Sequence, residues 1–163
     1  MRSQTDDIVL ENQIGQMLRH RGWRLVVAES CTGGLIAHRI TNIPGSSDYF
    51  LGGIVAYGYE AKVRLLGVQW DTLRKFGAVS EEVVLEMACG ARQAIEADIA
   101  VSVSGIAGPG GATLDKPVGL TWIGLSTQED EIARRFIWSG DRLAVKTHAA
   151  EAALQLIREY LSR

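Results

Sequence analysis

The sequence predicts an α/β protein with helices on both faces of a mixed β-sheet. Helix-like and strand-like patterns alternate along most of the 163 residues, and the last two strand-like segments follow each other directly, as in a hairpin. With 47% hydrophobic and 22% charged residues, the chain has enough apolar side chains for its own core. We therefore predict a single domain over residues 1–163.

Six segments carry helix signals. Residues 7–20 repeat apolar side chains at helical spacing. Ser80 is the predicted N-cap of a longer helix with two glutamates in its first turn, and Asp141 is the predicted N-cap of the last one. The other predicted helices cover residues 32–41, 59–66 and 71–76.

Five apolar segments bounded by Gly, Pro, Asp or Ser are predicted strands. They cover residues 23–28, 49–57, 98–104, 119–126 and 132–138. Polar or glycine-rich turns follow three of them, at residues 30–34, 58–62 and 105–111. Binding sites in open α/β sheets gather at the carboxyl ends of strands, so we expect these turns to converge.

Charge and composition exclude several classes of function. The net charge of −2 and the pI near 5.9 provide no broad basic surface, so nucleic acid is not expected as a partner. Apolar runs are too short for a spanning helix, so no membrane partner is expected. The two cysteines show neither metal-ligand spacing nor a disulfide framework, which predicts no metal site and a reducing, cytoplasmic location.

The turn after the first strand holds the best candidate nucleophile. Ser30 lies between an apolar strand and Gly33-Gly34, where backbone N–H groups at a helix start favour an anion or oxyanion. The hydroxyl is either reactive, if a base is near, or only an N-cap. Cys31 is a rival nucleophile that ranks below Ser30.

Lys62 is the best candidate for that base. His38 lies too far along the predicted helix, about 12 Å from Ser30 at helical rise. A lysine acts as a base only when neutral, and burial lowers its pKa, while Tyr57 or Tyr59 would help to carry the proton. The alternative is an ordinary solvated lysine. The glycine-rich turn at residues 105–111 lacks the P-loop lysine, so metal-assisted phosphoryl transfer is not favoured.

Six short motifs lie in order along nearly the whole chain, at residues 28–34, 44–47, 60–62, 77–80, 104–111 and 116–119. Together they closely resemble the CinA C-terminal domain family. The resemblance implies a three-layer α/β/α sandwich, a homo-oligomer, and no required metal or cofactor. Members of that family include amidohydrolases that convert nicotinamide mononucleotide to nicotinic acid mononucleotide and ammonia in pyridine nucleotide salvage, so a small-molecule mononucleotide is the expected substrate.

The resemblance also implies roles for individual residues. Ser30 would be the nucleophile, Lys62 its base and Tyr57 an assisting hydroxyl, and Ser47 competes with Ser30 for the nucleophile assignment. The residues implied to surround the substrate are Thr32, Gly33, Gly34, Ser46, Ser47, Gly105, Ile106, Ala107, Gly108 and Arg142. Gly58 and Tyr59 depart from the family's usual serine and asparagine. The alternative function is therefore a mononucleotide-binding or regulatory module with weak or no turnover.

Overall fold

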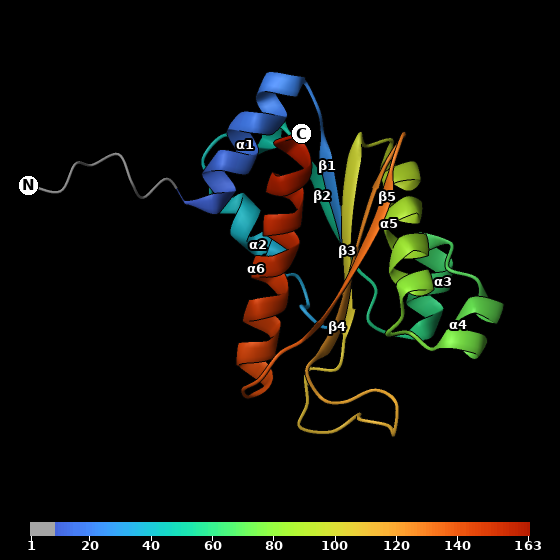
Figure 1. The fold of residues 1–163 in the computed structure, drawn as a ribbon. Helices are drawn as coiled ribbons and strands as arrows, with labels where there is room; N and C mark the ends of the chain where they lie inside the picture. The colour runs from blue at the N-terminus through green and yellow to red at the C-terminus, as the bar shows by residue number, and fades with distance from the viewer. Residues whose placement is uncertain (1–8) are drawn as a thin grey trace, which may run out of the picture.

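The computed structural model describes residues 9–163, which form a five-stranded sheet between two layers of helices (Figure 1). The strands are β1 (Leu25–Glu29), β2 (Phe50–Val55), β3 (Ile99–Gly105), β4 (Leu120–Thr127) and β5 (Glu131–Ile137). Their order across the sheet is β2-β1-β3-β4-β5. Strand β1 pairs in parallel with β2 and β3, whereas β4 pairs in antiparallel fashion with β3 and β5. The predicted mixed sheet and its final hairpin are confirmed.

Helices cover both faces of this sheet (Figure 1). On one face lie α1 (Leu10–Arg21), α2 (Leu35–Thr41) and α6 (Arg142–Leu161). On the other lie α3 (Tyr59–Leu66), α4 (Trp70–Phe76) and α5 (Glu81–Ile95). A short 3-10 helix, η1 (Ser46–Asp48), precedes β2. The fold is the three-layer α/β/α sandwich that the resemblance implied.

The core is divided between the two faces of the sheet. Every residue of β1 is buried, with Val27 packed among the residues of α1, α2 and α6, and Val26 and Ala28 packed on the α5 side. The contact of α5 with β4 is so close that a Cβ on Gly124 would lie 2.5 Å from the Val84 carbonyl oxygen. Only glycine fits there, because any side chain would push the helix off the sheet.

Element ends differ from the predicted ones by a few residues. Helix α2 begins at Leu35 rather than at residue 32, because Gly33 and Gly34 adopt φ angles of 61° and 102° and form a turn. Both predicted caps are confirmed: Ser80 accepts a hydrogen bond from the Val83 N–H, and Asp141 accepts one from the Ala144 N–H. The predicted start of the first helix, at residues 7 and 8, lies outside the described residues.

Among the helices of residues 9–163, none combines the length and the apolar character needed to cross a bilayer.

Candidate active site

The structure brings Ser30 and Lys62 into direct contact. Ser30 follows the last residue of β1, and its N–H donates to the carbonyl of Val103 in β3. Lys62 lies on the first turns of α3, which begins just after β2. Because β1 and β2 are parallel neighbours, both residues emerge at the same end of the sheet. The distance from Lys62 Nζ to Ser30 Oγ is 2.8 Å, so the two groups share a hydrogen bond.

Lys62 is buried and has three oxygen partners. Its side chain is 1% exposed, and Nζ also donates to the carbonyls of Ala56 at 2.9 Å and Tyr57 at 3.0 Å. Burial lowers the pKa of Lys62 from 10.5 to about 8, against a smaller opposing effect of Cys31. An uncharged amine has two N–H donors and one lone pair. The two carbonyls match the donors, which leaves the lone pair for the Ser30 hydroxyl proton.

Cys31 follows Ser30 directly in the chain, but burial affects its thiol in the opposite way from the Lys62 amine. Cys31 as a residue is 5% exposed, and burial is the main reason that the pKa of its thiol rises to about 11. A backbone hydrogen bond and the positive charges of Lys62 and Lys146 act to lower this pKa, but burial, together with the Glu29 charge, outweighs them. At neutral pH the thiol is protonated, and a protonated thiol is a poor nucleophile.

A buried carboxylate holds the turn around Ser30 in place. Glu29, the last residue of β1, is 0% exposed, and its carboxylate accepts hydrogen bonds from the N–H groups of Gly34, Ile36 and Ala37. It thereby caps the start of α2 from inside the protein. Sequence analysis missed this residue, although an acidic residue at the end of an apolar strand, just before a glycine turn, was an available signal.

The loop after β3 approaches the same turn. A Cβ on Gly105 would lie 3.1 Å from Cys31 Sγ and 2.7 Å from Thr121 Oγ1, so a larger residue would separate the loop from the turn. Ile106, Ala107 and Gly108 continue the loop, and the Gly108 carbonyl accepts a hydrogen bond from Arg142 at 2.7 Å. The predicted convergence of the turns at residues 30–34, 58–62 and 105–111 is therefore observed.

Tyr57 contributes differently from the expectation. Its carbonyl contacts Lys62, while its hydroxyl receives a hydrogen bond from Arg142 at 2.9 Å. Tyr57 is 59% exposed as a residue, and its hydroxyl is bonded to Arg142 at the surface rather than to Lys62 or Ser30. In this arrangement Tyr57 links Arg142 of α6 to the end of β2.

Ser46 and Ser47 do not join this group within one chain, which corrects the expectation that they surround the substrate beside Ser30. Both belong to η1, which precedes β2, whereas Ser30 follows β1. The first residue of β2 pairs with Leu25, the first residue of β1. The length of the sheet, about 17 Å at the usual rise per residue, therefore separates them from Ser30. For the same reason, Ser47 cannot replace Ser30 as the partner of Lys62.

Thr32, in the same turn as Ser30, has a donor that the fold leaves unpaired. The residue is 1% exposed, and its hydroxyl has no hydrogen-bond partner among the described residues. A buried hydroxyl without a partner is uncommon and calls for an explanation, such as a bound group.

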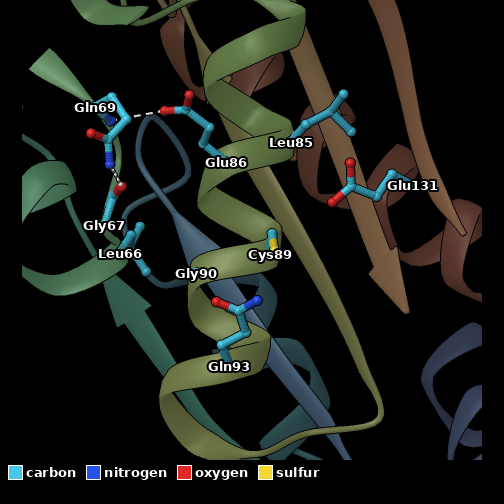
Figure 2. Close-up of a pocket in the computed structure, with 9 residues that line it drawn as sticks. All are labelled: Leu66, Gly67, Gln69, Leu85, Glu86, Cys89, Gly90, Gln93 and Glu131. Carbon is cyan, nitrogen blue, oxygen red and sulfur yellow. Dashed lines mark hydrogen bonds between the residues drawn. The ribbon is translucent and has the colours of Figure 1, made fainter. Parts of the chain in front are cut away.

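Away from Ser30 and Lys62, a cavity of about 290 Å³ lies between α3, α5 and the start of β5 (Figure 2). Its one carboxylate on α5, Glu86, is already engaged by the Gln69 N–H and the Thr72 hydroxyl. Cys89 is the only thiol in its lining. Neither Ser30 nor Lys62 borders it. Within residues 9–163, no group of three or more His, Cys, Asp or Glu side chains is placed to hold a metal ion.

Comparison with known proteins places the chain in a family. Residues 7–161 match the model of the CinA C-terminal domain. The chain belongs to the CinA C-terminal domain family. The chain is 52% identical, over 94% of its length, to a protein of Moorella thermoacetica named putative competence-damage inducible protein. This relative is a longer protein, and the match covers only 37% of its length. Two further relatives are likewise longer, with 39% and 38% of their lengths matched.

Another relative in the CinA family has a similar length to this chain. The nicotinamide-nucleotide amidohydrolase PncC of Escherichia coli K12 is 52% identical over 149 residues, which cover 91% of this chain and 90% of PncC. Among solved structures, the CinA superfamily protein from Klebsiella pneumoniae 700603 superimposes with a TM-score of 0.91 at 35% identity. The superposition covers 94% of this chain and 96% of the Klebsiella pneumoniae chain.

Proposed function

We propose that this protein hydrolyses the carboxamide of nicotinamide mononucleotide to nicotinic acid mononucleotide and ammonia, with Ser30 as nucleophile and Lys62 as base. The observation that carries the proposal is the 2.8 Å contact between Ser30 Oγ and the buried Nζ of Lys62. The identity of 52% with an amidohydrolase of similar length supports the choice of substrate.

The proposed reaction has two stages. Neutral Lys62 accepts the hydroxyl proton as Ser30 Oγ attacks the carboxamide carbon. Collapse of the tetrahedral intermediate breaks the C–N bond, and Lys62 returns the proton to the departing ammonia, which leaves an acyl ester on Ser30. Lys62 then takes a proton from water, which attacks the ester. The proton passes to Ser30 as the acid product leaves.

Two features of the turn support stabilisation of the oxyanion. The Thr32 hydroxyl is a buried donor without a partner, which an oxyanion would satisfy. The Glu29 carboxylate fixes the position of the turn by accepting hydrogen bonds from three backbone N–H groups. Hydrogen-bond donors in the turn therefore need not reorganise during the reaction. Gly33, Gly34, the loop at residues 105–108 and Arg142 are the proposed surroundings of the substrate.

The test is ammonia release from nicotinamide mononucleotide by the wild type, Ser30→Ala and Lys62→Met. We expect release by the wild type and its loss in both variants. Tight binding of the mononucleotide by the wild type without ammonia release would instead favour the binding module. Turnover by Ser30→Ala at the wild-type rate would remove Ser30 from the reaction. The homo-oligomer, the cytoplasmic location and the single domain over residues 1–163 stay predictions.

A further inference from the structure

Helix α6 brings the ammonium group of Lys146 to the turn that holds Ser30. Lys146 lies one helical turn after Arg142 on α6, so both side chains share a face of the helix. Arg142 reaches the Gly108 carbonyl and the Tyr57 hydroxyl. A Cβ placed on Gly33 would lie 3.8 Å from Lys146 Nζ, so the ammonium group sits directly against the glycine turn.

These two cations have no anionic partner in the described part of the chain. Neither Lys146 nor Arg142 takes part in any ion pair of residues 9–163. Glu29, the carboxylate of this turn, is buried and already accepts three backbone N–H groups. The half-buried Lys146 therefore leaves a positive charge against the turn that holds Ser30, and no ion pair within residues 9–163 neutralises it.

We propose that Lys146 binds the phosphate of the mononucleotide, an inference that rests on the proposed function. The phosphate is the only anionic group of that substrate. Its pyridinium ring is positively charged and is disfavoured beside an ammonium group, and its carboxamide is neutral and must meet Ser30. Because Gly33 carries no side chain, a phosphate oxygen can approach Nζ from the side of the turn.

The experiment compares two substrates that differ only in the phosphate: nicotinamide mononucleotide and nicotinamide riboside. Lys146→Met removes the charge and keeps the apolar stem, and Lys75→Met removes an exposed lysine of α4 as a matched control. For the mononucleotide, we expect Lys146→Met to raise KM about tenfold to a hundredfold, the range for loss of a charged hydrogen bond. For the riboside, kcat/KM stays unchanged, and Lys146→Arg restores most of the mononucleotide KM. An equal fall of kcat on both substrates, or no change on either, would overturn the proposal.

A binding measurement separates this proposal from the proposed function. Ribose 5-phosphate, titrated by calorimetry, carries the phosphate without the carboxamide. If the wild type released no ammonia, the proposed function would fail. Weaker binding of ribose 5-phosphate by Lys146→Met than by Lys75→Met would still support the phosphate site. Equal binding by the two variants would refute it.

Discussion

Raising the pH from 7 to 9.5 is expected to increase both the turnover and the stability of this protein, because Lys62 loses its proton in that range. Burial holds the Lys62 pKa at about 8 instead of 10.5. At pH 7 about a tenth of the folded molecules then carry neutral Lys62, and at pH 9 about nine tenths do. If the neutral amine is the base, kcat/KM rises about tenfold over these two pH units.

The stability change follows from the same pKa. Between pH 8 and 10.5 the unfolded chain binds a proton at Lys62 that the folded chain does not, so the free energy of unfolding rises with pH. Well below pH 8, Lys62 is protonated in both the folded and the unfolded protein, so the free-energy cost of burying its charge no longer changes with pH. From pH 7 to pH 9.5 the wild type gains about 2 kcal/mol from this residue. Lys62→Met has no such group, so the difference in unfolding free energy between the two proteins changes by that amount.

Urea denaturation of both proteins across this range measures the stability term without any substrate, and other titrating groups cancel in the difference. Formation of nicotinic acid mononucleotide, corrected for breakdown without protein, measures the kinetic term. A constant stability difference from pH 7 to 9.5 would show that the Lys62 pKa is not lowered. A constant kcat/KM, or turnover by Lys62→Arg, would refute its role as a neutral base.

Three further predictions concern the turn around Ser30. Ser30→Ala is expected to lose ammonia release while its urea denaturation midpoint stays close to that of the wild type, whereas a large drop in the midpoint would assign Ser30 a structural role. Cys31→Ala should retain turnover, and the Cys31 thiol, with a pKa of about 11, should react with iodoacetamide at pH 8 far more slowly than a free thiol. Glu29→Ala leaves the N–H groups of Gly34, Ile36 and Ala37 without their acceptor and should cost about 3 kcal/mol or more of unfolding free energy. If Glu29→Ala had the same free energy of unfolding as the wild type, the proposed capping role of Glu29 would be wrong.

The contact between Ser30 and Lys62 was accessible to sequence reasoning because both residues follow apolar strands at recognisable turns. Parallel strands bring such turns to one end of the sheet. The distance of Ser46 and Ser47 from Ser30 depends on the parallel pairing of β2 with β1, in which Phe50 lies opposite Leu25, at the other end of the sheet from Ser30. The resemblance implied that these serines surround the substrate, whereas their place before the predicted strand at residues 49–57 puts them at the end of the sheet away from Ser30.

Charged residues were harder to interpret than apolar ones. Glu29 stands in an otherwise apolar strand, and only the fold shows that its carboxylate turns back to the N–H groups of α2. Lys146 resembles any solvent-facing lysine of an amphipathic helix until the packing of α6 sets it against Gly33. Propensity and periodicity specify which face of a helix is buried, whereas the partners of a charged group depend on contacts between distant segments.

The environment of the turn also bears on why a serine, rather than the adjacent cysteine, is the proposed nucleophile. Desolvation acts in opposite directions on the two kinds of group: it raises the pKa of Cys31 to about 11 and lowers that of Lys62 to about 8. A thiolate paired with an ammonium places two charges in the buried site, whereas the reactive form of the Ser30–Lys62 pair, a hydroxyl and a neutral amine, places none. Charge then develops only as Ser30 attacks, at the point where Thr32 and the ordered turn can stabilise it. A buried lysine therefore suits a hydroxyl nucleophile better than a thiol, and the same burial that makes Lys62 a base makes Cys31 unreactive.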